Sequence, residues 1–205
     1  PQVGEAVVEI FRHLGLAVEV PRDQTCCGQP AYNAGYHKAA RKAARHFIET
    51  FDTSAGEVIV CPSGSCVDMV RRHYPELFAN DPAWRRRAER VAAKTFELTE
   101  FLVDVMGVTD LGARFEGTVT YHDSCHLNRY LGVAEQPRAL INAVREARFV
   151  EMADSDRCCG FGGTFAAMGF FLALWKVMFI SLAVFVVSSV IIVMYGSFFA
   201  QPIKS

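Results

Sequence analysis

Residues 58–66 read Val-Ile-Val-Cys-Pro-Ser-Gly-Ser-Cys, an apolar run followed at once by a loop that has a cysteine at each end. Three consecutive β-branched residues favour a short strand, and the Pro-Ser-Gly stretch favours a turn. A helix is expected to begin near Ser65 and to continue toward Tyr74. Cys61 therefore lies at the carboxyl end of a predicted strand, the edge where ligands gather in open α/β sheets.

Hydrophobic periodicity predicts the same alternation of helices and strands in both halves of the chain. The expected helices cover residues 3–14, 32–51, 82–106 and 128–146, and the expected strands cover residues 16–20, 58–60, 119–121 and 149–151. Strands that alternate with helices form βα units, and such units build a mainly parallel sheet. The predicted fold class is therefore α/β, with two tandem βα repeats.

The seven cysteines fall into two sets, each containing an adjacent pair followed by glycine. Adjacent cysteines are poorly placed to form a disulfide with each other, whereas they can place two thiolates on one metal centre. The spacing repeats as well, because 33 residues separate Cys27 from Cys61 and 32 residues separate Cys125 from Cys158. The first set is Cys26, Cys27, Cys61 and Cys66, and the second is Cys125, Cys158 and Cys159.

Composition narrows the class of protein. The formal net charge is -1 and the pI is about 6.7, which gives no sign of a nucleic-acid partner. The basic run 85–87 lies in a predicted helix that also carries acidic residues, a pattern typical of a solvated helix face. Seven cysteines without an amino-terminal signal peptide favour a reducing, cytoplasmic compartment and a metal or redox use of the thiols.

The carboxyl-terminal segment differs from the rest. Residues 177–200 contain no charged side chain and are rich in Val, Ile, Phe, Leu and Met. A bilayer core needs about 20 such residues in a helix, so this segment is predicted to cross the membrane once. Trp175, Lys176 and Lys204 would anchor its ends, with the cysteine-bearing part on the cytoplasmic side. The predicted organisation is thus a first repeat over 1–110, a second over 111–166, and a membrane segment and tail over 167–205.

Several uses of the cysteines remain open on the residues alone. Thiolates hold iron–sulfur clusters, and four cysteines of the first set would also satisfy a structural zinc ion. Two more uses are a catalytic thiol at Cys125, with a neighbouring histidine as base, and a set of reversible disulfides. Glycines next to the cysteines, Gly28 and Gly160 among them, would let backbone amides approach the sulfurs, although a tight turn explains each of them equally well.

Three polar residues surround Cys125, and two roles are open for them. His122, Asp123 and His126 could relay a proton or line a substrate pocket, because imidazole titrates near neutral pH. Alternatively, they form the hydrogen bonds that orient metal ligands and cap the loop.

Four motifs occur in order along the chain. They are Cys-Cys-Gly-Gln-Pro at 26–30, Cys-Pro-Ser-Gly-Ser-Cys at 61–66, Tyr-His-Asp-Ser-Cys-His at 121–126 and Cys-Cys-Gly-Phe-Gly-Gly-Thr-Phe at 158–165. Over about residues 1–166 they resemble the cysteine-rich CCG-domain family, and they are most similar to its lactate-utilisation branch. Iron–sulfur subunits of glycolate oxidase and of heterodisulfide reductase are wider relatives.

The resemblance implies an iron–sulfur electron-transfer subunit with clusters of the four-iron, four-sulfide type. Some relatives bind zinc in one repeat. In the family each repeat carries five cysteines, of which this chain has four in the first repeat and three in the second. The implied ligands are the two sets of cysteines given above.

The function predicted from this resemblance is electron transfer in a 2-hydroxy-acid oxidation system of the L-lactate type. Partner subunits would carry the substrate chemistry, because the chain has no GxGxxG fingerprint and no phosphate loop. A membrane quinone is the expected acceptor. Two different functions stay open: an assembly subunit of a membrane complex without a working cluster, and a thiol–disulfide redox subunit of the heterodisulfide reductase kind.

Overall fold

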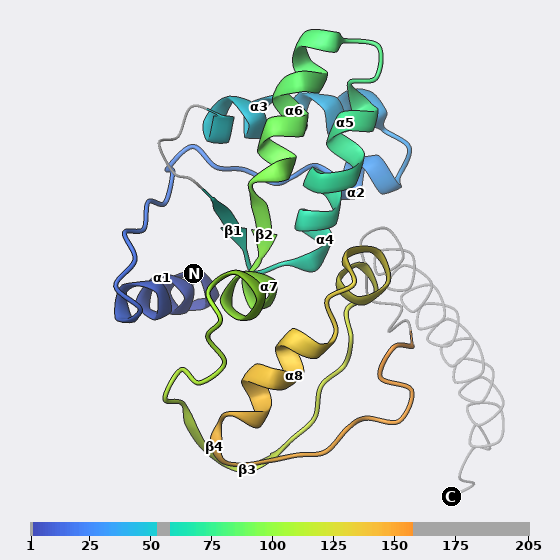
Figure 1. Ribbon diagram of the computed structural model, residues 1–205. Helices are drawn as coiled ribbons and strands as arrows, with labels where there is room; N and C mark the ends of the chain where they lie inside the picture. The colour runs from blue at the N-terminus through green and yellow to red at the C-terminus, as the bar shows by residue number, and fades with distance from the viewer. Residues whose placement is uncertain (1, 53–57, 158–205) are drawn as a thin grey trace, which may run out of the picture. The chain divides into compact units, whose positions relative to one another are not determined.

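The structure is a computed structural model that describes residues 2–52 and 58–157 (Figure 1). Within these ranges no helix is both long enough and apolar enough to span a membrane. The predicted membrane segment 177–200 lies outside the described residues, as does the pair Cys158-Cys159 with Gly160.

The first half is built around a two-stranded parallel sheet. Its elements are α1 (Gln2–His13), α2 (Gln29–Asn33), α3 (His37–Asp52), β1 (Ile59–Cys61), α4 (Gly64–Asp68), the π-helical turn η1 (Met69–His73), α5 (Tyr74–Leu77), α6 (Pro82–Ala93), β2 (Thr95–Glu97), α7 (Leu98–Glu100) and the π-helical turn η2 (Phe101–Val105). β1 pairs with β2, with Ile59 opposite Thr95 and Cys61 opposite Glu97. Cys61 therefore ends its strand, as the sequence predicts.

The second half repeats this unit in a shorter form. Its elements are β3 (Arg114–Val119), the π-helical turn η3 (His126–Tyr130), α8 (Glu135–Asn142) and β4 (Arg145–Phe149). β3 and β4 are parallel, with Val119 opposite Phe149, and α8 is the helix of the crossover between them (Figure 1). The predicted α/β class with short parallel sheets is confirmed.

Two apolar clusters hold the first half together. The larger one joins α3, α5 and α6, which bury Ile48, Tyr74 and Val91. The smaller one brings α1 against η2, where the rings of Phe11 and Phe101 meet edge to face at 5.7 Å between centroids. Such packing of the apolar helix faces leaves the polar faces in solvent.

Two sequence predictions are wrong in the first half. Residues 82–106 do not form one helix, because α6 ends at Ala93 and the chain then forms β2. The Thr95 hydroxyl donates to the Val91 carbonyl at 2.7 Å, which gives one of the last carbonyl groups of α6 a hydrogen-bond partner. Residues 95–97 then pair with β1. Residues 16–20 form no strand, since Leu16 and Val18 pack on the smaller cluster instead of joining a sheet.

Other boundaries shift by several residues. The predicted helix 32–51 begins at His37, because Tyr32 belongs to α2 and Gly35, with φ of 80°, separates the two helices. The predicted helix 128–146 begins as the turn η3 and resumes as α8. The strands predicted at 119–121 and 149–151 end, rather than begin, near those positions.

Candidate functional site

The vicinal pair Cys26-Cys27 lies against α3, and Gly28 makes this placement possible. Cys27 is buried and Cys26 is exposed. Gly28 has φ of 87°, and a Cβ atom there would lie 3.0 Å from the Ala43 Cβ and 3.2 Å from the Ala40 carbonyl oxygen. A side chain would therefore be both strained and crowded, so the glycine of the Cys-Cys-Gly motif lets the pair approach the helix.

Three thiols of the first set lie together, those of Cys27, Cys61 and Cys66. Cys66 accepts side-chain hydrogen bonds from Cys27 and Cys61, and Ser63 and Ser65 interact with the same sulfur. These hydrogen bonds lower the pKa of Cys66 well below that of an ordinary thiol. The same bonds, together with burial, raise the pKa of Cys27 and of Cys61. The pKa shifts in the cluster therefore have opposite directions: the pKa is lowered at Cys66 and raised at Cys27 and Cys61.

Tyr74 fixes the backbone of the buried cysteine. Its hydroxyl donates to the Cys27 carbonyl at 2.9 Å, and both residues belong to the larger apolar cluster. Burial, the largest cause, raises the pKa of Tyr74, so the phenol remains a hydrogen-bond donor. The Cys26-Cys27 loop is thus tied to α5 as well as to α3.

A single imidazole connects the motifs of the two halves. His126 Nδ1 lies 2.8 Å from Asp68 Oδ2, and its Nε2 lies 3.2 Å from the side-chain nitrogen of Gln29. Asp68 is 1% exposed and also receives the Arg72 guanidinium at 3.3 Å. Because Gln29, Asp68 and His126 come from three different cysteine motifs or their immediate flanks, we call them the motif bridge.

The two halves also touch through Gly64 in α4. A Cβ atom at this position would lie 2.7 Å from the Leu127 Cβ and 3.1 Å from the Leu127 backbone, so glycine allows η3 to pack against α4. Leu127 is buried by this contact. The partly buried Cys125 directly precedes η3, so this packing places it near α4, the helix that contains Cys66.

Arg138 organises the loop around Cys125. Its guanidinium donates to both carboxylate oxygens of Asp123 at 2.9 Å, and it also pairs with Glu151 at 2.8 Å. Its further hydrogen bonds go to the Ala134 carbonyl and the Ser155 hydroxyl. The hydrogen bond from Arg138 lowers the pKa of Asp123, so that the carboxylate stays charged although it is almost fully buried.

The chain that leads to Cys158 is tied to the same loop. The amide of Asp123 donates to the Ser155 carbonyl, His122 Nε2 bonds the Arg157 carbonyl, and Arg129 donates to the Asp156 carbonyl, each at 2.8 Å. Residues 155–157 therefore run alongside the Cys125 loop. Cys158, Cys159 and Gly160 themselves lie outside the described residues.

The polar residues around Cys125 thus act mainly on the loops. Asp123 and His122 hold backbone segments together, and His126 forms the motif bridge. The partners of these residues could not be recognised from the sequence. Gln29 stood inside a motif, whereas Asp68, Tyr74 and Arg138 carried no signal beyond that of ordinary helix residues.

The donor set suits a soft metal centre by its chemistry. Thiolates are the ligands of iron–sulfur clusters, and a ligand must be deprotonated to bind, a state that the lowered pKa of Cys66 favours. Among residues 2–52 and 58–157, no three His, Cys, Asp or Glu side chains stand in an arrangement that could hold a single metal ion. In the structure, Cys27 and Cys61 instead each form a hydrogen bond with Cys66.

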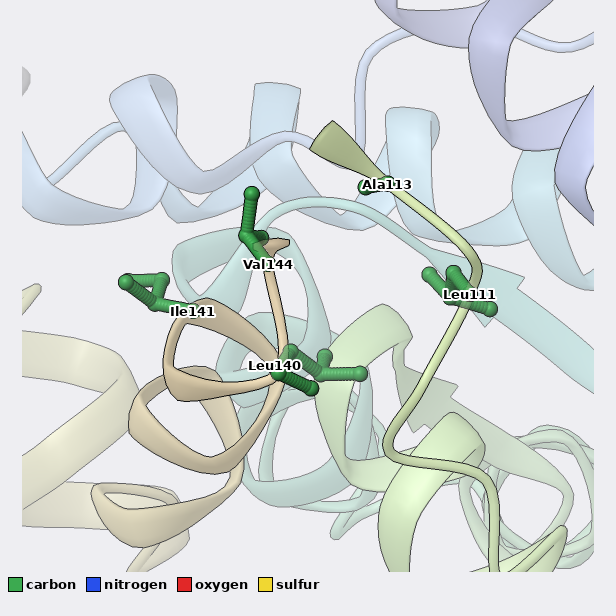
Figure 2. A pocket seen from close by; sticks show the side chains of 6 residues that line it. Leu111, Ala113, Leu140, Ile141 and Val144 are labelled. Atoms are coloured by element: carbon green, nitrogen blue, oxygen red, sulfur yellow. The ribbon is translucent and has the colours of Figure 1, made fainter. Parts of the chain in front are cut away.

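An apolar hollow of about 180 Å³ lies in the second half and, unlike the thiol cluster, is lined only by aliphatic side chains (Figure 2). Its lining comes from α8, the turn after α8 and the segment before β3: Leu111, Ala113, Leu140, Ile141, Ala143 and Val144. Small-molecule sites combine apolar walls with a few polar groups that orient the ligand. This hollow has no titratable or hydrogen-bonding side chain in its lining, so the thiol cluster is the better candidate site.

Comparison with known proteins identifies the class. The profile of the CCG family, described as a cysteine-rich domain, matches residues 1–71 and 119–179. The chain belongs to the CCG cysteine-rich domain family, as its four motifs predict. The second matched segment runs past residue 166, where the motif-based resemblance ends.

Individual relatives narrow this class to one branch. The chain is 56% identical over 166 residues to Lactate utilization protein A of Exiguobacterium sp., covering 81% of this chain and 67% of the relative. It is 50% identical over 165 residues to the protein of the same name from Macrococcus caseolyticus, covering 80% and 66%, and 51% identical over 164 residues to that of Anoxybacillus flavithermus, covering 80% and 68%. The chain thus spans about two thirds of the length of these relatives.

Proposed function

We propose that this chain is an iron–sulfur electron-transfer subunit of a 2-hydroxy-acid oxidation system of the L-lactate type. The observation that carries the proposal is the convergence of the Cys27 and Cys61 side chains on that of Cys66 at the carboxyl end of β1. The name of the similar proteins, Lactate utilization protein A, supports the choice of substrate class.

The ligands proposed for the first repeat are Cys26, Cys27, Cys61 and Cys66, and those for the second are Cys125, Cys158 and Cys159. A bound cluster would supply one-electron chemistry, with a potential set by its charge, its exposure and the hydrogen bonds to its sulfurs. The chain contributes the thiolate at Cys66, the amide of Gly28, which lies 3.5 Å from the Cys26 sulfur, and the Tyr74 anchor that fixes the Cys27 backbone. The motif bridge fixes Cys125 relative to these groups.

Partner proteins and a membrane complete the proposed system. Other subunits would carry the substrate site, and residues 177–200 would anchor the chain to the cytoplasmic membrane, where a quinone could accept electrons. The charge-free composition of that segment supports the anchor. Fractionation of cells that express the full chain tests the anchor: recovery in the membrane fraction, and its loss when residues 170–205 are deleted, is the expected outcome.

Anaerobic purification with iron and sulfide analysis and EPR spectroscopy tests the cluster. We expect iron and sulfide in equal amounts, and Cys66→Ser should lose the part of both that the first repeat binds. Val20→Ser, at an exposed position of the loop after α1, is the matched control and should keep the full content. Zinc as the bound metal, with no iron after reconstitution, would sink the electron-transfer proposal. Turnover of small disulfides with an EPR signal that depends on them would point to a thiol–disulfide redox function instead.

A further inference from the structure

The helices α3 and α6 carry an excess of positive charge that the proposed function does not use. Together they contain eight Lys or Arg and three Asp or Glu, in a chain whose formal net charge is -1. Outside these two helices, the chain therefore contains more acidic than basic residues. We define the basic face by these cations: Lys38, Arg41, Lys42 and Arg45 of α3, and Arg85, Arg86, Arg87 and Arg90 of α6.

The cations of α3 share one side of the helix. Lys38, Lys42 and Arg45 are spaced by four and three residues, so they follow one another along the exposed stripe opposite the buried Ala40 and Ala44. The ordinary explanation for such a stripe is solvation. Two further observations favour a binding role.

The first observation is that the two helices form one surface. α3 and α6 pack against each other and cross (Figure 1). The guanidinium groups of Arg45 and Arg87 both contact the Trp84 ring, at 5.1 Å and 4.6 Å from its centroid. Cation–π contacts of this kind orient the two arginines, of which Arg45 also pairs with Asp81 and Arg87 with Asp52. The stripe on α3 is thereby continuous with the cations of α6.

The second observation is that part of this charge lacks a counter-ion. Asp52 pairs with Arg87 and Arg90 at the junction of the helices, and Glu89 pairs with Arg85. Lys38, Lys42 and Arg86 form no ion pair with another described residue, and all three are exposed. An uncompensated surface charge strengthens association with an oppositely charged partner.

The burial of the apolar side chains of α3 and α6 indicates whether the partner is a membrane or a protein. Basic helices that bind membranes insert apolar side chains into the interface. Here the apolar sides of α3 and α6 are buried in the larger cluster, and none of the exposed large apolar side chains among the described residues lies on either helix. The basic face therefore suits a surface that offers carboxylates rather than lipid.

We infer that the basic face is the docking surface for an acidic electron-transfer protein. The buried side of α3 holds Gly28 and Cys27, so a protein bound to the outer side would lie about one helix diameter, about 10–12 Å, from the thiol cluster. The electron-transfer role of this partner rests on the proposed function. The docking itself rests only on the charges, and it is therefore measured without any metal.

Binding to two small acidic redox proteins, a flavodoxin and a plant-type ferredoxin, tests the surface. The affinity of the full chain for each is measured by calorimetry at low and at physiological ionic strength, before any reconstitution. We expect binding to at least one probe, weakened by salt, and about tenfold weaker for the triple variant Lys38→Glu, Lys42→Glu and Arg86→Glu. The matched control is the double variant Arg12→Glu and Arg22→Glu, which reverses exposed cations outside both helices and should bind as the unchanged chain does.

Three outcomes would overturn the inference. They are no binding to either probe at low ionic strength, equal loss of binding in the control variant, and binding by the triple variant that matches the unchanged chain. Vesicles of phosphatidylcholine and phosphatidylglycerol form a further arm, and binding to them that is lost in the triple variant would assign the face to a membrane instead. Thermal unfolding of each variant verifies its fold. A chain that binds flavodoxin but no iron would retain the docking surface and lose the proposed function.

Discussion

His126 Nδ1 lies 2.8 Å from Asp68 Oδ2, and this contact joins the cysteine motifs of the two halves of the chain. Asp68 follows Cys66 by two residues and is 1% exposed, while His126 directly follows Cys125. Two loops that are almost sixty residues apart in sequence are thereby held in one place. The side chain of Gln29, two residues after Cys27, bonds the other ring nitrogen, so the imidazole connects its own motif to two of the other three motif regions.

Replacement of His126 by alanine should destabilise the fold by about 1–3 kcal/mol, because it removes a hydrogen bond from a buried carboxylate. Among the described residues, Asp68 would then keep its pairs with Arg72 at 3.3 Å and His73 at 3.7 Å. Urea denaturation gives the free energy of unfolding. His13→Ala is the matched control, since this imidazole is exposed on α1, and it should change the stability by less than about 0.5 kcal/mol. Equal effects of the two variants would show that the bridge does not stabilise the protein.

Gly64→Ala should loosen the contact between α4 and η3. The added Cβ atom would approach the Leu127 Cβ to 2.7 Å, which forces one of the two segments to move, at a cost of about 1–3 kcal/mol. Gly4→Ala on α1 meets nothing within 4 Å and should leave stability unchanged or slightly raised, because alanine favours a helix. Denaturation of both variants measures the difference. A stability of Gly64→Ala equal to that of the unchanged chain would mean that the halves do not depend on this close approach.

The fold class and the strand end at Cys61 could be predicted because local patterns determine them: β-branched runs, turn residues and amphipathic periods. β2 could not, since Thr95-Phe96-Glu97 follows a helical pattern and becomes a strand only through pairing with β1. The prediction for residues 16–20 is wrong in the opposite direction. Their alternating pattern predicts a strand, but Leu16 and Val18 pack on the smaller apolar cluster instead of pairing with another strand.

The candidate site was predictable to the same extent. Cysteine spacing marks the thiols, and the structure brings Cys27, Cys61 and Cys66 together. The residues that hold the loops, Asp68 and Arg138, act on partners distant in sequence, and no local pattern distinguishes them from solvated helix residues. Tertiary contacts alone define their roles.

Cys66 should be a thiolate at neutral pH in the reduced, metal-free protein. The hydrogen bonds from Cys27 and Cys61 lower its pKa, so the ultraviolet absorbance of one thiolate should persist below pH 7, where an ordinary thiol with a pKa of about 8.5 is protonated. Cys66→Ser should abolish this signal. Cys26→Ser is the control, because the exposed Cys26 is not one of the two hydrogen-bond donors, and it should leave the signal in place. Absorbance that appears only above pH 8 in the unchanged chain would contradict the arrangement.

The lowered pKa of Cys66 also makes the stability of the protein depend on pH in a definite direction. When folding lowers the pKa of a thiol, the contribution to stability is complete above the ordinary thiol pKa and is lost as the pH falls through the lowered value. The advantage of the unchanged chain over Cys66→Ser should therefore shrink steadily from pH 9 toward acid. Urea denaturation across this range, on metal-free protein, measures it. A difference that grows on acidification would show that Cys66 is not the charged member of the cluster.

Arg138→Met should be among the most destabilising single changes in the second half. It leaves the Asp123 carboxylate, whose side chain is 4% exposed, with the Ser155 hydroxyl at 3.2 Å and the Asn128 side chain in place of a bidentate cation. Removing one member of a buried ion pair costs about 3–5 kcal/mol. The matched control is Arg114→Met, which breaks an exposed pair with Glu146 and should cost less than about 1 kcal/mol.

The pH dependence of the Arg138→Met effect separates the lost ion pair from lost packing. In the unchanged chain the hydrogen bond from Arg138 holds the pKa of Asp123 below its usual range, so the pair contributes fully above the ordinary aspartate pKa of about 3.9 and less as the pH falls through the lowered value. Without Arg138, burial favours the neutral acid, and protonation relieves the variant at low pH. The difference in unfolding free energy between the two proteins should therefore narrow from pH 7 to pH 3. A difference that stays constant over this range would assign the loss to the contact of the guanidinium group with the Tyr121 ring rather than to the ion pair with Asp123.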